Sequence, residues 1–468
     1  MPLTNQQIIA GIEGLLGHVL SDPARMASYV EEPRRRFHVP ALAVAVPTTV
    51  ADVQKLVAWA NDNRVPLIPQ GGNTGLVGGQ VPLAGNEVIV STTRLQGVRE
   101  VNAEAGHMTL EAGVILEQAQ RLADEAGALF PLHIASQGSA RIGGVLSTNA
   151  GGVGVLAYGN ARALCLGVEA VLADGRLYQG LSSLRKDNTG YDLKDLLVGA
   201  EGTLGIITAA TLKLFPKPED YETALVNVAT PDDALQLFHA LSERAGGRLT
   251  AFELLPRFGI EMLLQHGMIE RDPAASHAPW YCLIEVSRMR GTPEGTLVDG
   301  LAAAVDAGLV ADAAVAGSLR ERALMWAARE NLSEVQSREG ASIKHDVSVP
   351  IAQVPRLIGE GSLAAARLVP GIRPCPFGHM GDGNIHFNFT QPAGADGKAF
   401  MAGADAVHAA IHEIVARLGG SISAEHGIGQ LKTALLKQVK DPVALDMMRA
   451  IKRALDPNGI LNPGKVLV

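Results

Sequence analysis

Two histidines and a glutamate in this chain have the side chains of a metal site. His379 and His386 lie close together in a glycine-rich stretch, and Glu425 and His426 come later in the sequence. Two imidazoles and a carboxylate are the protein ligands of an open, catalytic type of metal site, which keeps one position for substrate. Because His-x6-His is a weak spacing pattern, a glycine-rich turn with two surface histidines is the alternative interpretation.

A β-hairpin must position these histidines. The glycines, aspartate and asparagine of residues 381–384 predict a tight turn between two strands, which folds His379 back toward His386. Side chains alternate along a strand, so we expect His386 and Asn388 on one face of the second strand.

A second group of polar residues has the chemistry of a carboxylate-binding site. Periodicity predicts one long helix over residues 318–337, in which Arg329 and Ser333 are four residues apart and share a face. In a predicted strand over residues 342–349, alternation sets Lys344 on the polar side. A guanidinium fork, a hydroxyl and an ammonium could therefore converge on one carboxylate. A solvated helix face with an internal salt bridge is the alternative.

Three glycine-rich loops in the first half of the chain indicate a large ligand. They cover residues 69–76, 136–152 and 199–208, and the first follows a predicted buried strand. Successive glycines let backbone N–H groups turn inward around a phosphate, although each loop alone could be a tight turn. Three such loops in one region predict a phosphate-containing cofactor.

One glycine motif points elsewhere, and we reject it. Residues 152–157, Gly-Val-Gly-Val-Leu-Ala, match the G-x-G-x-x-A dinucleotide fingerprint. They follow a polar stretch instead of a hydrophobic strand and precede no obvious helix, so we predict no Rossmann-type NAD site.

The composition is that of a soluble globular protein with two or three domains. The 468 residues are 47% hydrophobic and 19% charged, and the net charge of −8 argues against a nucleic-acid partner. We expect no membrane span, because no apolar run is long enough. Three scattered cysteines indicate a reducing compartment, which makes the cytoplasm the expected location.

Changes in pattern along the chain predict three parts. Strands and helices alternate up to residue 216, where a Pro-Lys-Pro-Glu-Asp stretch breaks the pattern. We therefore expect a first domain over residues 1–216, a second over 217–420 that carries the hairpin, and a mostly helical C-terminal segment over 421–468.

The loop sequences resemble a known family of flavoproteins. Pro-Gln-Gly-Gly-Asn-Thr-Gly at 69–75, Ile-Gly-Gly at 142–144 with Asn-Ala-Gly-Gly at 149–152, and Gly-Ala-Glu-Gly-Thr-Leu-Gly-Ile-Ile-Thr at 199–208 are similar to the FAD loops of the vanillyl-alcohol-oxidase/p-cresol-methylhydroxylase fold. More closely, the chain resembles D-2-hydroxyacid dehydrogenases, D-2-hydroxyglutarate dehydrogenase above all, over about residues 36–465. The resemblance implies an α+β protein: a two-part FAD-binding domain, an α+β substrate (cap) domain and a helical C-terminal segment that packs back on the flavin domain.

The resemblance implies FAD as the cofactor. Some relatives carry a histidine after the paired glycines of the first loop for covalent attachment, whereas this chain has Asn73, so dissociable FAD is implied. The implied cofactor residues are Pro69, Gln70, Gly71, Gly72, Asn73, Thr74, Gly75, Leu76, Ser136, Gly138, Ser139, Ile142, Gly143, Gly144, Ser147, Asn149, Gly151, Glu201, Gly202, Gly205, Ile207 and Asn462.

The resemblance also assigns roles to the two polar groups. The implied ligands of Zn2+, or of another divalent metal, are His379, His386 and Glu425. Residues implied to hold the distal carboxylate of the substrate are Arg329, Ser333 (in place of the commoner threonine) and Lys344. Asn388 and His426 are implied to hold the reacting end.

These assignments imply oxidation of a D-2-hydroxy acid to the 2-oxo acid, with D-2-hydroxyglutarate favoured and hydride passing to flavin N5. A metal that chelates the hydroxyl lowers its pKa, and neutral His426 accepts the proton as the catalytic base. Alternatives are a D-lactate, D-malate or glycolate dehydrogenase, a two-His-one-carboxylate iron oxygenase, and a non-catalytic flavin-binding subunit. Relatives pass electrons to electron-transfer flavoprotein or a quinone; the acceptor and the oligomeric state, a homodimer included, stay open.

Overall fold

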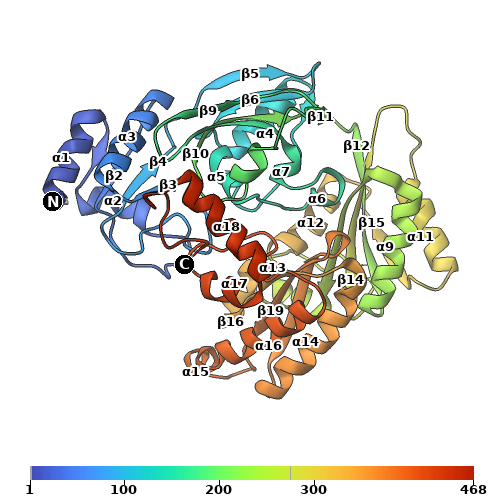
Figure 1. The fold of residues 1–468 in the computed structure, drawn as a ribbon. Coiled ribbons are helices and arrows are strands. Elements are labelled where there is room, and N and C mark those ends of the chain that lie inside the picture. Colours follow the sequence, from blue (N-terminus) through green and yellow to red (C-terminus); the bar gives the residue numbers. More distant parts are fainter. Residues whose placement is uncertain (1–2, 275, 468) are drawn as a thin grey trace. The chain divides into compact units, whose positions relative to one another are not determined.

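The computed structural model describes residues 3–274 and 276–467, which form two compact units (Figure 1). Unit 1 takes the chain up to Gly152, together with Gly159–Lys217 and the segment from Glu425 onward. Unit 2 takes Val153–Tyr158 and Pro218–Ala424. The predicted first domain, residues 1–216, thus differs because Val153–Tyr158 groups with unit 2 and Lys217 with unit 1, and the predicted C-terminal segment joins unit 1 only from Glu425.

Unit 1 opens with a small mixed sheet in the order β1-β2-β4-β3, made of Val19–Leu20, Ala43–Ala45, Val88–Ser91 and Leu67–Gln70. Strands β2 and β3 both run parallel to β4. Helix α3 (Val50–Asn63) connects β2 to β3, and it starts at Thr49 because Thr49 and Asp52 form a reciprocal capping box. The helices α1 (Asn5–Leu15) and α2 (Pro23–Val30) precede it.

A second, antiparallel sheet of unit 1 has the order β5-β6-β10-β8-β9. Its strands are Val98–Asn102, His107–Glu111, Ile206–Lys213, Cys165–Val171 and Leu177–Gly180. A short strand pair joins β7 (Ala128–Leu129) and β11 (Phe215–Pro216). The helices of this part are α4 (Leu116–Glu125), α5 (Ile142–Ser147), α7 (Ala161–Leu164) and α8 (Lys194–Leu197), and the C-terminal segment adds α17 (Thr433–Val439) and α18 (Pro442–Leu455).

Unit 2 is built on one sheet in the order β15-β12-β14-β13-β18-β19-β16, with β17 also paired to β19. The strands are β12 (Asp220–Val228), β13 (Leu249–Pro256), β14 (Trp280–Arg288), β15 (Asp312–Val315), β16 (Ser342–Ile343), β17 (Asp346–Ser348), β18 (Arg373–His379) and β19 (Asn384–Thr390). All of its strand pairs are antiparallel.

Helices cover both faces of this sheet and bury a core on each. The larger core packs against α9 (Pro231–Ala245), α11 (Thr296–Asp306), α14 (Val354–Leu368) and α16 (Ala404–Arg417), which gather on one side of the strands in Figure 1. The other core packs against α10 (Arg257–Gln265), α12 (Leu319–Glu330) and α13 (Leu332–Glu339). The short helices α6 (Val155–Tyr158), α15 (Gly397–Ala402) and the 3-10 turns Gly246–Arg248, Ile351–Gln353 and Met380–Asp382 complete the unit.

Two predicted elements of unit 2 are interrupted. The single helix predicted over residues 318–337 is wrong: α12 ends at Glu330 and α13 begins at Leu332, with Asn331 between them. Asparagine favours helix ends because its side chain competes for backbone hydrogen bonds. The predicted strand 342–349 is likewise divided into β16 and β17, although both halves keep one register against β19.

No helix in residues 3–274 and 276–467 combines the length and the apolar character that crossing a membrane requires.

Candidate active site

The predicted hairpin forms and brings the two histidines together. Strands β18 and β19 pair with Phe377 opposite His386, and a 3-10 turn at Met380–Asp382 joins them. The turn closes at Gly383, whose φ of +84° is a conformation that glycine adopts without strain. The ring centroids of His379 and His386 are 5.5 Å apart. His386 and Asn388 share a face of β19, as predicted, because Ile385, Phe387 and Phe389 occupy the opposite, core-facing side.

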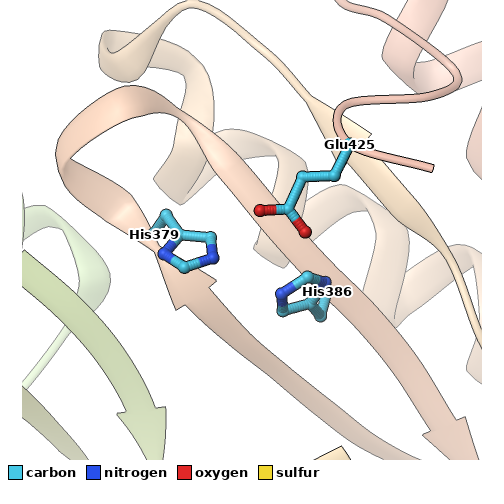
Figure 2. A group of neighbouring side chains, drawn as sticks. All are labelled: His379, His386 and Glu425. Carbon is cyan, nitrogen blue, oxygen red and sulfur yellow. The ribbon is translucent and has the colours of Figure 1, made fainter. Parts of the chain in front are cut away.

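Glu425 joins this pair through the backbone that precedes it. Ala424 N donates to Asp346 O at 3.4 Å, and Ser421 pairs with Ser348, so the chain is tied to β17 up to the residue before Glu425. The carboxylate of Glu425 points toward both imidazoles in Figure 2, and one ligand atom from each of the three residues lies within 4.8 Å of the others. The three predicted metal ligands are therefore neighbours.

A second group of potential metal ligands shares Glu425. It consists of Asp346, Glu425 and His426, whose ligand atoms also lie within 4.8 Å of one another. Asp346 is buried on β17 directly opposite His386, with its Oδ1 4.0 Å from Nδ1 of that histidine. Sequence reasoning did not include Asp346 among the ligands. We favour the first group for a zinc-type ion, because it offers two nitrogen donors and one oxygen.

Glu253 lies behind His379, and sequence reasoning missed it. It sits opposite His379 in the register of β13 and β18, and its Oε1 accepts a hydrogen bond from His379 Nδ1 at 2.8 Å. Burial on its own raises the pKa of a carboxyl, but the charges and hydrogen bonds of His379 and Arg329 hold the pKa of Glu253 well below its usual value. The available signal was a single acidic residue inside strand 249–256, whose other residues are apolar except Thr250.

Arg329 bonds to the other oxygen of the Glu253 carboxylate. Its Nε donates to Glu253 Oε2 at 2.5 Å, its Nη2 lies 3.4 Å from His379 Nε2, and its guanidinium lies over the Phe377 ring. Arg329 is only 7% exposed, so of the alternative interpretation, a solvated helix face with an internal salt bridge, only the salt bridge holds for this residue. Among the described residues no group bonds to Nη1, which leaves that nitrogen for a further acceptor.

The other predicted substrate residues form two groups: Lys344 lies beside Ser333, and Asn388 bonds to other residues. Lys344 Nζ donates to the carbonyl of Ser333 at 2.7 Å, so these two residues are neighbours as the carboxylate-site prediction required. Asn388 is buried, donates from Nδ2 to Gln336 Oε1 at 2.8 Å and accepts from the backbone N–H of His345 at 3.2 Å. The helix break at Asn331 means that Arg329 and Ser333 do not share one continuous helical face.

The first glycine-rich loop has an unpaired row of backbone donors. Within the described residues, none of the backbone N–H groups of 71–76 has a hydrogen-bond acceptor. A Cβ on Gly72 would lie 2.0 Å from the carbonyl oxygen of Ser139, so only glycine fits there. The side chain of Arg141 packs on Gly71, and its buried Nε also has no partner in the described part of the chain. Unpaired donors beside a cation fit an anionic group such as a diphosphate.

Two side chains of this loop turn away from it. Gln70 is buried and donates to the carbonyls of Tyr29 and Gln80, both at 2.8 Å. Asn73 has a φ of +54° and donates to the carbonyls of Ser28 and Glu31 at 3.0 and 2.7 Å. These carboxamides therefore hold the loop to its neighbours.

The second loop forms helix α5 and a turn. The backbone N–H groups of Ile142 and Gly143 bond to Val114 and Ala112, so these two positions dock the helix against β6 and its following turn. Gly144 has open space where a side chain would project, which fits close approach of a ligand. Asn149 has a φ of +51° and accepts from the backbone N–H of Arg162 at 2.9 Å.

The third loop is tied to the C-terminal segment within unit 1. The buried carboxylate of Glu201 accepts from the backbone N–H groups of Ile428 and Gly429, both at 2.7 Å. Burial raises the pKa of Glu201 despite these bonds. Asn462 donates to the carbonyls of Gly79 and Glu201 at 2.9 and 2.7 Å, while its buried Oδ1 has no partner among the described residues. Asn462 thus connects Gly79, which follows the first loop, to the third loop and keeps an acceptor for a ligand.

The rejected dinucleotide fingerprint has no Rossmann geometry. The short helix α6, within the motif, is preceded by α5 and a loop instead of a strand. A Cβ on Gly152 would lie 1.8 Å from the carbonyl oxygen of His133, so this glycine serves close packing.

Two known protein families match this chain over separate ranges. Residues 41–180 match the family described as FAD binding domain, and residues 217–466 match FAD linked oxidases, C-terminal domain. The chain is 36% identical to the mitochondrial D-2-hydroxyglutarate dehydrogenase of Bos taurus, with 99% of this chain and 84% of the relative covered. It is also 36% identical to the D-2-hydroxyglutarate dehydrogenase of Xanthomonas citri pv. viticola, with 95% and 93% covered.

The chain belongs to the D-2-hydroxyglutarate dehydrogenase family. It is an FAD-linked D-2-hydroxyacid dehydrogenase, so the predicted enzyme class and FAD cofactor are confirmed. Solved structures show the same fold: p-cresol methylhydroxylase with substrate bound has a TM-score of 0.76 at 17% identity, covering 98% of this chain and 96% of that one. The 4-ethylphenol oxidase of Gulosibacter chungangensis has a TM-score of 0.75 at 19% identity, covering 99% and 97%. The predicted fold class is confirmed.

Proposed function

We propose that this D-2-hydroxyglutarate dehydrogenase relative oxidises D-2-hydroxyglutarate to 2-oxoglutarate, using non-covalent FAD and one divalent ion held by His379, His386 and Glu425. The metal proposal rests on one observation: a ligand atom from each of the three residues lies within 4.8 Å of the other two. The names of the curated relatives support the substrate.

The donor set supports an ion of the zinc type. Because Glu253 accepts from Nδ1 of His379, that ring carries its proton on Nδ1 and presents the lone pair of Nε2. Two imidazole nitrogens and one carboxylate leave the position that a catalytic zinc keeps for substrate. When bound, such an ion supplies Lewis acidity that lowers the pKa of a coordinated hydroxyl group.

The chain's own residues account for the remaining steps. His426, next to Glu425, accepts the hydroxyl proton as general base, and Asn388 holds the reacting end through the second hydrogen on Nδ2. Arg329 Nη1, Lys344 and the Ser333 hydroxyl bind the distal carboxylate of a diacid, with charge-assisted bonds from the two cations. Bound FAD supplies the hydride acceptor at N5.

Two finer parts of the proposal concern the cell. We place the enzyme in a reducing, cytoplasmic environment, because Cys165, Cys282 and Cys375 are buried free thiols. We propose electron-transfer flavoprotein or a quinone as the electron acceptor, by analogy with the family. A homodimer is compatible with the proposal.

A substrate panel tests this function against its nearest rival. Steady-state rates with an artificial electron acceptor are compared for D-2-hydroxyglutarate, D-malate, D-lactate, glycolate and the L-isomers, with and without a chelator. We expect the highest kcat/KM for D-2-hydroxyglutarate, loss of activity with chelator, and recovery with Zn2+. A higher kcat/KM for D-lactate would replace the proposal with a D-lactate dehydrogenase, which needs no second cationic pocket.

A further inference from the structure

We propose that Glu253 is a positioning residue that orients the metal ligand His379 and the substrate-binding Arg329 with a single carboxylate. The inference rests on the function proposed above and adds a residue that sequence reasoning did not contain. All three residues belong to unit 2.

One oxygen of the Glu253 carboxylate, Oε1, sets the tautomer of His379. Glu253 Oε1 and His379 Nδ1 are 2.8 Å apart, and the two residues face each other across β13 and β18. An ionised carboxylate only accepts hydrogen bonds, so Nδ1 is the protonated ring nitrogen and Nε2 carries the lone pair. Metal-binding histidines commonly have such a partner, which fixes the ring and makes it a better ligand.

The other oxygen of the Glu253 carboxylate, Oε2, holds Arg329. Its Nε bonds to Glu253 Oε2 at 2.5 Å, and the guanidinium lies 5.1 Å from the centroid of Phe377. A planar guanidinium fixed by one edge and one face cannot rotate, so its other nitrogens project in a set direction. Glu253 therefore links the orientation of the carboxylate-binding group to that of the metal ligand.

A neighbouring ion pair shows what a purely structural glutamate does on this face. Glu285, on the adjacent strand β14, bonds to Nε and Nη2 of Arg322 at 2.8 and 3.0 Å, and accepts from Trp326 and Thr223. Arg322 and Arg329 project from the same helix, α12. Both glutamates thus pair with an α12 arginine, but within the described part of the chain the Glu285 carboxylate bonds to no histidine.

This neighbour provides a matched control for the experiment. Zn2+ affinity is measured on the flavin-loaded protein by competition with a chromophoric chelator, for wild type, Glu253→Gln and Glu285→Gln. Removing the carboxylate behind a metal-binding histidine typically weakens metal binding by about 10- to 100-fold. We therefore expect Glu253→Gln to lose about tenfold or more in Zn2+ affinity and Glu285→Gln to bind as wild type.

A second pair of variants covers the case in which Glu253→Gln does not fold because Arg329 is left unpaired. Arg329→Leu alone should keep wild-type Zn2+ affinity, whereas the double variant Glu253→Leu/Arg329→Leu, which has no orphan charge, should show the same loss as Glu253→Gln. Flavin absorbance and the unfolding temperature verify folding in each variant.

Three results would overturn the inference. Glu253→Gln could bind Zn2+ within about threefold of wild type, below the loss expected for such a partner, or the double variant could bind as tightly as Arg329→Leu. In both cases wild type still binds Zn2+ and the proposed function stands. A wild type that binds no Zn2+ would instead refute the metal part of the proposed function and this inference together.

Discussion

Glu253 and His379 face each other across two antiparallel strands although 126 residues separate them in the sequence, and their side chains bond at 2.8 Å. The bond places the ring proton of His379 on Nδ1 and leaves the lone pair on Nε2, which Arg329 Nη2 approaches at 3.4 Å. The hairpin brings the ligands together, and the neighbouring strand supplies the group that orients one of them.

Replacing Arg329 tests the choice of a diacid substrate. One charge-assisted contact to a carboxylate contributes about 1.5–3 kcal/mol, which corresponds to roughly one to two powers of ten in kcat/KM. Arg329→Ala should therefore lower kcat/KM for D-2-hydroxyglutarate far more than for D-lactate, and Arg329→Lys should restore only part because it lacks the fork.

The matched control for this prediction is Arg322→Ala on the same helix. Arg322 pairs with Glu285, so its loss should leave the ratio of the two substrates unchanged. Equal losses for both substrates in Arg329→Ala would mean that Arg329 acts on the shared end or on folding.

Replacing His386 tests the metal centre. His386→Ala removes one of two nitrogen ligands and should abolish both bound metal, measured by elemental analysis, and turnover. The flavin spectrum should stay intact, because the cofactor loops lie in unit 1. His277→Ala is the control, since His277 is exposed and should change neither. Full turnover in a His386→Ala protein shown to lack metal would refute the metal's role.

The first glycine-rich loop predicts dissociable FAD. Asn73 stands where covalent relatives carry a histidine, and its carboxamide bonds to the carbonyls of Ser28 and Glu31. Acid precipitation should therefore release flavin into the supernatant, where its absorbance is read. Flavin that stays with the precipitated protein would contradict the prediction.

The buried side chain of Lys465 should make the unfolding free energy depend on pH in the alkaline range. Its buried ammonium donates to Val81 O, and burial lowers the pKa of Lys465 to about 8, with Glu87 opposing the shift. Between pH 8 and the ordinary value of 10.5, the unfolded chain binds a proton that the folded chain has released, so raising the pH favours folding. The unfolding free energy of wild type relative to Lys465→Met should therefore rise across this range.

Urea unfolding of both proteins at several pH values from 7.5 upward measures that difference, with pH 7.5 as the reference. A difference that stays constant with pH would show that Lys465 titrates at its ordinary value.

Local signals were sufficient for many elements of this fold. Thr49 caps α3 through Asp52, three residues away, and contacts between residues so close in sequence are the kind that a local pattern specifies. The hairpin of His379 and His386 formed for the same reason, since a turn and strand alternation specify it locally.

Features that depend on distant residues were missed. No local pattern joins Glu253 to His379, nor does any assign Val153–Tyr158 to the second unit. Asn331 interrupts a helix whose hydrophobic period continues across the break, so periodicity alone could not place that break. The glycine loops were predicted to bind a ligand from their composition, but the carboxamides of Gln70 and Asn73 turn away from the loop to partners elsewhere in the fold.

Anaerobic reduction of the bound flavin tests the proposed oxidation of D-2-hydroxyglutarate without any external electron acceptor. Purified protein is mixed with D-2-hydroxyglutarate without oxygen, and flavin absorbance is followed with and without prior metal removal. We expect rapid bleaching by D-2-hydroxyglutarate, slower bleaching by D-lactate and none by L-2-hydroxyglutarate. Metal-free protein should not bleach until Zn2+ is added back. Flavin that stays oxidised with D-2-hydroxyglutarate, or that bleaches equally well without metal, would contradict the proposed function.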